Sequence, residues 1–288
     1  MQEAYAHCTA LVRTADKDRY LATLFVPERV RSHVFALYAF NSEIASVRER
    51  VKEPLAGAIR LQWWRDVLTG DAAGSATRNP VAAALIDTVD RYWLPRDILA
   101  ALIDAREFDL HNDAMPTLDA YEAYVRSTTS ALFALVARLL AGDDARASKA
   151  SDATGLAYGT TGLLRAFALH SSRGQIYLPV EVLNQCGVPP SDIVAGKGTP
   201  GVRAALAAMR GKAARRLAEA RTRLLDVPSV ARPAFLPIAL VDVYLARMER
   251  ADYQPFHTRI EVPQWRRQWA LWRAAHALKN DAAADPSD

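Results

Sequence analysis

The chain has 288 residues and a net charge of +4, from 36 Lys and Arg against 32 Asp and Glu. This charge lies well below the basic excess of a nucleic-acid-binding protein, and no apolar run reaches the roughly 20 residues of a membrane-spanning helix. Two isolated cysteines and an N-terminus without signal-peptide features predict a reducing compartment. We therefore expect a single domain over residues 1–288, cytoplasmic or peripheral on the cytoplasmic face of the membrane.

Helical periodicity and the placement of prolines predict an all-α fold. Val34, Leu37 and Ile44 keep the 3.6-residue spacing of a core-facing stripe, and no alternating strand pattern competes with it. In chain order, the predicted helices cover residues 3–24, 28–50, 55–69, 80–93, 95–112, 118–141, 146–170, 201–226, 233–251 and 263–279. The predicted irregular segments are 70–79, 112–117 and 186–200, together with a disordered tail at 281–288.

Two segments are the most informative about function. The first is Phe35-Ala-Leu-Tyr-Ala-Phe-Asn-Ser-Glu-Ile-Ala-Ser-Val-Arg-Glu49, and the second runs from Gly155 and ends in Arg173-Gly-Gln-Ile-Tyr-Leu-Pro179. They resemble the two active-site helices of the squalene/phytoene synthases, in the same order along the chain. The resemblance covers residues from about Tyr20 to Tyr253. It implies a bundle of the isoprenoid-synthase type, with helices around a central cavity.

In that family, each active-site helix carries aspartates at i and i+4, which bind one magnesium ion that holds a diphosphate. By the resemblance, the carboxylate positions of the first helix fall on Ala45, Ser46 and Glu49. Those of the second helix fall on Ala166 and His170. Magnesium prefers oxygen ligands, so a histidine does not replace an aspartate. We therefore expect no metal site and no cofactor, with magnesium needed only if the chain is an active synthase.

Glu49 and His170 each have a structural interpretation that we favour. Glu49 is flanked by Arg48 and Arg50, which favours a surface glutamate paired with arginine over a metal ligand. His170 is interpreted as a helix-end histidine, with a pocket-lining donor to an anion as the alternative.

Several side chains near the motifs are candidates for binding a prenyl diphosphate or lipid without turnover, because guanidinium groups bind phosphate well. These ligand-binding candidates are Tyr38, Arg48, Arg126, Arg165, Arg173 and Tyr177. Of the arginines, Arg165 and Arg173 have support from the motif, and a solvated or ion-paired side chain is the alternative for each. Gly159 and Gly162 lie three residues apart on a predicted helix and are interpreted as packing positions.

The C-terminal helix predicted at 263–279 is amphipathic, aromatic and basic. Trp265, Trp269 and Trp272 fall at i, i+4 and i+7 and form one stripe, with Arg266, Arg267 and Arg273 beside it. We favour the interpretation that the tryptophans pack on the bundle while the arginines face water. A membrane-interface helix and a protein-docking surface are the alternatives.

Three functional hypotheses follow. The segments Asp18-Arg-Tyr-Leu-Ala-Thr-Leu-Phe25 and Ile59-Arg-Leu-Gln-Trp-Trp-Arg-Asp66 resemble the branch of the family that includes a mitochondrial complex I assembly factor, regarded as lacking synthase chemistry. The favoured hypothesis is therefore a non-catalytic binding protein or assembly protein with a respiratory-complex subunit as partner. The alternatives are an active prenyltransferase with a site remodelled around Glu49, Arg165 and Arg173, and a peripheral membrane lipid-binding protein. Nucleic acid is not an expected partner.

Overall fold

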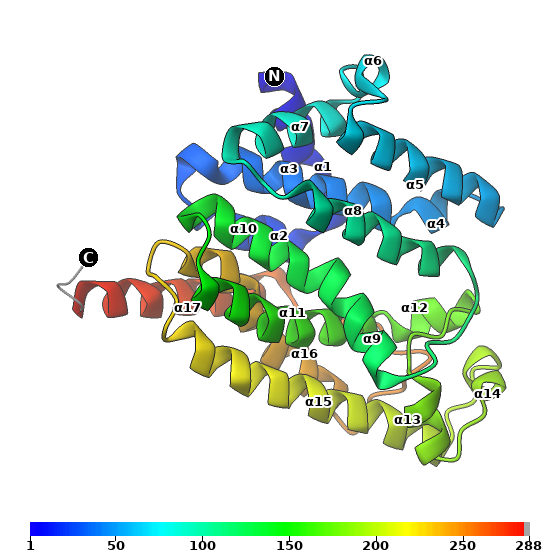
Figure 1. Cartoon of the computed structure of the whole chain (residues 1–288). Helices are drawn as coiled ribbons and strands as arrows, with labels where there is room; N and C mark the ends of the chain where they lie inside the picture. The colour runs from blue at the N-terminus through cyan, green and yellow to red at the C-terminus, as the bar shows by residue number, and fades with distance from the viewer. Residues whose placement is uncertain (285–288) are drawn as a thin grey trace.

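The computed structural model describes residues 1–284 and is a bundle of helices (Figure 1). Within these residues there is no β-strand, and one isolated parallel bridge joins Ala114 to Ile176. The first half of the chain contains α1 (Gln2–Ala15), α2 (Lys17–Thr23), α3 (Glu28–Ala45), α4 (Val47–Arg50), α5 (Pro54–Thr69), α6 (Ala73–Ala76), α7 (Pro80–Tyr92), α8 (Arg96–Ala105), the 3₁₀ helix η1 (Arg106–Leu110), α9 (Leu118–Val125), the π-helix η2 (Arg126–Ser130) and α10 (Ala131–Ala141). The second half contains α11 (Ala145–Arg165), α12 (Phe167–Ser172), α13 (Val180–Gln185), α14 (Pro190–Val194), α15 (Pro200–Leu224), the 3₁₀ helix η3 (Arg232–Leu240), α16 (Val241–Met248) and α17 (Gln264–Ala284). The all-α prediction is confirmed.

The predicted helices are present, but three of them are broken at single residues, and three others include a 3₁₀ or π segment, namely η1, η2 and η3. The helix predicted at 3–24 is broken at Asp16, which lies between α1 and α2. The Asp16 carboxylate accepts a hydrogen bond from the Arg19 backbone N–H (3.0 Å) and thereby caps the start of α2. Ser46 separates α3 from α4, and Ala166 separates α11 from α12. Both have nearly the same backbone angles, φ −89° and ψ 1° at Ser46 and φ −88° and ψ 4° at Ala166.

Other boundaries differ in smaller ways. Short helices form within two segments predicted to be irregular, α6 in 70–79 and α14 in 186–200. Helix α13 falls in a segment for which no helix was predicted. In the predicted tail 281–288, α17 continues to Ala284, and residues 285–288 lie outside the described residues.

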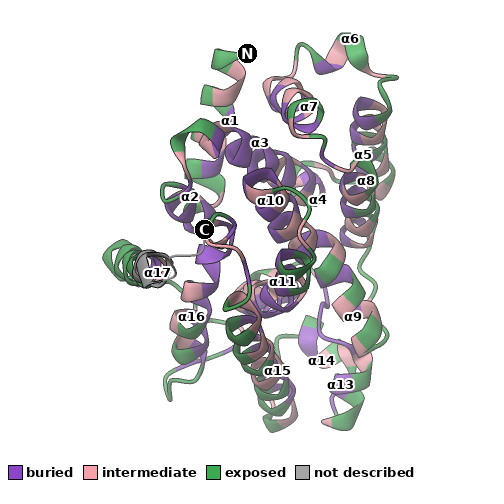
Figure 2. Ribbon diagram, turned by 60° about the vertical axis from the view of Figure 1, so that its left-hand side comes forward, coloured by how far each residue is buried: buried purple, intermediate pink, exposed green. Residues whose placement is uncertain are grey.

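Helix α11 is at the centre of the bundle and connects its two halves. It packs along α15 on one side and against α10 and η2 on the other. One hydrophobic cluster contains α3 and α10 and includes Phe40 and Phe133, and a second lies around α13, α15 and α17 and includes Leu183 and Leu271. Figure 2 shows the corresponding burial along α3 and α10. None of the helices in residues 1–284 has both the length and the hydropathy needed to cross a bilayer.

Glycines on α11 decide how closely α9 and η2 approach it. A Cβ at Gly155 would lie 2.3 Å from the Ser130 Cα, and a Cβ at Gly159 would lie 2.6 Å from the Val125 Cγ1. A Cβ at Gly162 would meet nothing within 4 Å. The packing interpretation is therefore confirmed for Gly159 and wrong for Gly162.

Replacing Gly155 by Ala is expected to destabilise the fold by about 1–3 kcal/mol, because the new methyl group overlaps the backbone of η2. Gly162→Ala on the same helix is the matched control. It has open space and is expected to stabilise by about 0.5–1 kcal/mol, since alanine loses less backbone entropy than glycine. Urea unfolding followed by circular dichroism measures both. Equal stabilities of the two variants would contradict this account of α11 packing.

Candidate functional site

The two motif segments come together at the interrupted ends of α3 and α11. Glu49 on α4 is exposed, whereas Ala45, Ser46, Ala166 and His170 are partly buried. The Ser46 hydroxyl donates to the Glu43 backbone carbonyl (3.0 Å). Together the five motif positions offer one carboxylate, one hydroxyl already engaged with the backbone, and one imidazole.

Glu49 pairs across the site with Arg173. The Arg173 Nη1 lies 2.6 Å from the Glu49 Oε1, and the two side chains are 40% and 50% exposed. The flanking arginines are engaged elsewhere: the Arg50 guanidinium pairs with Glu43 (2.6 Å), and the Arg48 Nη2 donates to the Asn112 Oδ1 (3.4 Å). Glu49 is thus a glutamate paired with arginine, as we expected, but its partner is distant in sequence.

These donors do not fit a magnesium ion. Mg²⁺ in proteins is held by carboxylates and phosphate oxygens, and the one carboxylate of the motif positions is engaged with a guanidinium. No group of three or more His, Cys, Asp or Glu in the described part of the chain is arranged to hold a metal ion.

His170 is an uncharged group of the site at neutral pH. Its ring lies 4.6 Å from the Tyr177 ring, centroid to centroid. Burial is the main cause that lowers the pKa of His170. The nearby Asp109 raises this pKa and Arg173 lowers it, and the resulting value is about 4. A neutral imidazole adds no positive charge for an anion, which favours the structural interpretation of this histidine.

Beside His170, a buried polar cluster is built around Asp109 on η1. The Asp109 Oδ1 accepts hydrogen bonds from the hydroxyls of Tyr177 (2.7 Å) and Tyr124 (2.8 Å), and its Oδ2 accepts from the Arg106 Nη1 (3.1 Å). Tyr177 is held in place by backbone pairing around the isolated bridge, where the Met115 N–H donates to the Ile176 carbonyl (3.2 Å). The predicted ligand-binding candidate Tyr177 is thus a partner of Asp109.

A second buried cluster is built around Asp18 on α2, whose side chain is 3% exposed. Its Oδ2 accepts from the Arg165 Nη1 (2.7 Å) and the Tyr244 hydroxyl (2.6 Å), and its Oδ1 accepts from the Arg267 Nη1 (3.0 Å). Burial alone would raise the pKa of Asp18, but the charge of Arg165 and these hydrogen bonds outweigh it and lower the pKa. Arg165, predicted to bind a ligand, is therefore paired with a buried carboxylate.

Between these clusters lies a cavity of about 180 Å³ lined by residues of α2, η1, α9, η2, α11 and α16. This volume is below the roughly 300–1,000 Å³ of typical small-molecule sites. Arg19, Arg106 and Arg165 all line it. Each pairs with an aspartate: Arg19 with Asp16 (3.1 Å), Arg106 with Asp109, and Arg165 with Asp18.

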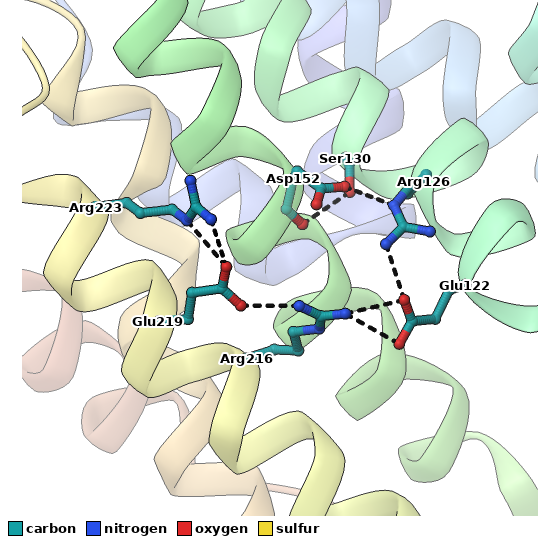
Figure 3. A network of polar contacts seen from close by, with 7 residues as sticks. All are labelled: Glu122, Arg126, Ser130, Asp152, Arg216, Glu219 and Arg223. Carbon is teal, nitrogen blue, oxygen red and sulfur yellow. Dashed lines mark hydrogen bonds and ion pairs between the residues drawn. The ribbon is translucent and has the colours of Figure 1, made fainter. Parts of the chain in front are cut away.

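Two further ligand candidates are also engaged in contacts within the chain. Tyr38 is buried on α3, and the Arg19 guanidinium lies 5.2 Å from the centre of its ring. Arg126 is not among the residues that line the cavity. It belongs to a surface network in which it pairs with Glu122 and Asp152 (both 2.8 Å), and Glu122 also pairs with Arg216 on α15 (Figure 3).

A larger cavity lies away from the motif helices. It has a volume of about 1,220 Å³ and is lined mainly by α5, α7 and α8, including Leu68, Ile86 and Ala100. None of the site residues predicted from the sequence lines it.

A model of the squalene/phytoene synthase family matches residues 12–273. The chain belongs to the squalene/phytoene synthase family. A rat protein named "NADH dehydrogenase (ubiquinone) complex I, assembly factor 6" is 32% identical over 259 residues, which cover 90% of this chain and 78% of the relative.

Solved structures share the fold of this chain. A squalene synthase of Alicyclobacillus acidocaldarius, HpnC, is 27% identical, with a TM-score of 0.77 over 88% of this chain and 96% of that one. A dehydrosqualene synthase in complex with a ligand is 20% identical, with a TM-score of 0.83 over 97% and 98%. The predicted isoprenoid-synthase-type bundle is thereby confirmed.

Within the family fold, α17 presents the tryptophan stripe to solvent. The side chains of Trp265, Trp269 and Trp272 are 62%, 54% and 42% exposed, and Arg266 and Arg273 are exposed as well. The favoured interpretation that the tryptophans pack on the bundle is therefore wrong, and so is the expectation that Arg267 faces water, because it pairs with the buried Asp18. The opposite face of α17 makes the packing contacts.

Some residues of the site were not singled out from the sequence. Asp16 and Arg106 line the cavity, and Asp18 holds Arg165, yet none of the three was a candidate. The signal available for Asp18 was its position in the segment Asp18–Phe25 that resembles one branch of the family.

Asp18→Asn is expected to destabilise the fold by about 3–5 kcal/mol, because it leaves Arg165 and Arg267 near a neutral partner in a buried site. The folded-state pKa of Asp18 is lowered, so its contribution is present above its unfolded pKa of about 3.9 and is lost as the pH falls below that value. Urea unfolding between neutral and acidic pH measures both effects, and Asp18→Asn is expected to reduce the acid sensitivity.

The control is Asp252→Asn, which removes a carboxylate from an exposed pair with Arg250 in which both side chains are 59% exposed. Fully exposed pairs of this kind contribute little to stability because water screens them. If Asp18→Asn cost no more than this control, Asp18 would not be the stabilising centre described above.

Proposed function

We propose that this family member does not condense prenyl diphosphates and instead supports the assembly of respiratory NADH dehydrogenase. The observation that carries the proposal is the 2.6 Å ion pair between Glu49 and Arg173. It engages the one carboxylate of the motif positions with the arginine of the second motif. The function proposed therefore needs neither magnesium nor another cofactor.

The electrostatics of the cavity support this proposal. Departure of diphosphate from an allylic carbon requires cations that neutralise the developing negative charge, and losing such stabilisation costs several kcal/mol for each interaction. Three arginines line the cavity, and each of them pairs with an aspartate, although Asp18 is shared between Arg165 and Arg267. Little net positive charge remains to hold or ionise a diphosphate.

The relatives support the assembly role. The rat relative carries the name of a complex I assembly factor, and a human protein of the same name is 32% identical over 255 residues. We infer that this chain has a subunit of that complex, or an intermediate of its assembly, as its protein partner.

An active prenyltransferase is the second candidate, favoured by the 27% identity to a protein named squalene synthase. In that case Glu49, Arg165 and Arg173 would form a remodelled site, and Glu49 would have to exchange Arg173 for a metal-bound substrate. The small cavity of about 180 Å³ would also have to widen to admit prenyl chains.

Purified protein supplied with farnesyl diphosphate and Mg²⁺ is expected to release no diphosphate above a protein-free control, because the arginines of the cavity are paired with aspartates and the motif positions do not fit Mg²⁺. The Alicyclobacillus squalene synthase serves as the positive control. In the native host, deletion of the gene is expected to lower the NADH dehydrogenase activity of membranes, and the wild-type gene restores it.

The variant Glu49→Gln, expressed in the same deletion strain, distinguishes the assembly hypothesis from the prenyltransferase hypothesis. The assembly hypothesis predicts that this variant still restores NADH dehydrogenase activity, since the pair is exposed and contributes at most about 1 kcal/mol to stability. Metal-dependent product formation that disappears in Glu49→Gln would contradict the proposal. Full NADH dehydrogenase activity in the deletion strain would contradict the assembly role.

A further inference from the structure

We propose that α17 carries a docking site for an anionic membrane surface. The site is the tryptophan face, defined as Trp265, Trp269 and Trp272 with the flanking Arg266 and Arg273. This inference is independent of the proposed assembly function, because it rests on the exposure and charge of one helix.

The opposite face of α17 holds the helix on the bundle. Leu271 is fully buried and Ala275 is 6% exposed, and both belong to the cluster around α13 and α15. Arg267 points inward and pairs with Asp18 at 3.0 Å. Figure 2 shows α17 at the margin of the molecule. The tryptophan face is therefore not needed to attach the helix and remains available for another surface.

The aromatic part of this face has the chemistry of a membrane interface. The Trp269 and Trp272 rings stack with centroids 5.0 Å apart, and the Arg266 guanidinium lies 5.2 Å from the Trp265 ring. Indole combines a large apolar body with one N–H donor, so tryptophan is enriched where hydrocarbon meets lipid headgroups. The three rings span seven residues, or about 10 Å of helix, along one face.

The charge of the segment selects an anionic surface. Between Glu261 and Asp281 the sequence has four cationic residues and no acidic one. Of these, Arg266 and Arg273 are exposed beside the rings, whereas Arg267 is occupied by Asp18. A cation close to an anionic leaflet strengthens binding by about fivefold. The pattern matches helices that lie in the interface plane with aromatic and basic residues side by side.

Vesicle co-sedimentation of the full chain tests this inference, using phosphatidylcholine vesicles with and without one third phosphatidylglycerol. Wild-type protein is expected to bind the anionic vesicles more tightly, and rising salt weakens this binding because it screens the arginines. Replacing Arg266 and Arg273 by Gln is expected to weaken binding to anionic vesicles about 25-fold and to leave binding to neutral vesicles unchanged. Replacing all three tryptophans by Ala is expected to weaken binding to both vesicle types by at least about tenfold.

Matched controls test whether the loss of vesicle binding is specific to substitutions in α17. Trp93→Ala removes a tryptophan that is 86% exposed at the end of α7, and replacing Arg29 and Arg215 by Gln removes two exposed charges elsewhere. Both controls are expected to bind as wild type does. Circular dichroism confirms that each variant is folded, and the arginine variant tests the proposal even if the tryptophan variant does not fold.

Two outcomes would overturn the inference. One is that wild-type protein does not bind anionic vesicles, and the other is that the α17 variants bind as tightly as the controls. If vesicle binding is absent and the α17 variants still fail to restore NADH dehydrogenase activity, the tryptophan face docks a protein instead.

Discussion

Neutralisation of charge inside the helical bundle is the constraint on which the structure of this site depends. Three arginines face one small cavity, and a buried guanidinium is tolerated only when a carboxylate or another acceptor compensates it. Asp18 has the largest part in this balance, because it binds Arg165 of the second motif helix, Arg267 of the C-terminal helix and the hydroxyl of Tyr244. One carboxylate thus fixes the relative positions of four helices.

The same balance supports the proposal that this chain uses a synthase scaffold for a different role. A fold does not determine function, which depends on the groups that the scaffold presents. In this chain the charged groups near the motifs satisfy one another: Glu49 with Arg173, Asp109 with Arg106, and Asp18 with Arg165. The neutral His170 adds no charge to the set. The exposed surface, in particular the tryptophan face of α17, is then the part of the molecule that is available to bind another surface.

The sequence predicted the helices well because their signals are local. Proline at the first turn begins α5, α7 and α15, and apolar periodicity identifies the buried stripe of α3. The breaks at Ser46 and Ala166 carry no comparable signal, since alanine is the strongest helix former and only tertiary packing ends the helix there. For α17 the tryptophan stripe was visible, but Leu271 and Ala275 form a competing apolar stripe at i and i+4, and periodicity alone does not say which one is buried.

The site itself was less predictable, because its contacts join residues far apart in sequence. Glu49 was expected to pair with its neighbours but binds Arg173, and the partners of Asp18 come from α11, α16 and α17. Calorimetric titration of pyrophosphate with and without Mg²⁺ tests the central claim that these internal pairs leave no diphosphate site. No magnesium-dependent binding is expected. Tight binding that requires Mg²⁺ and is lost in Glu49→Gln would contradict it.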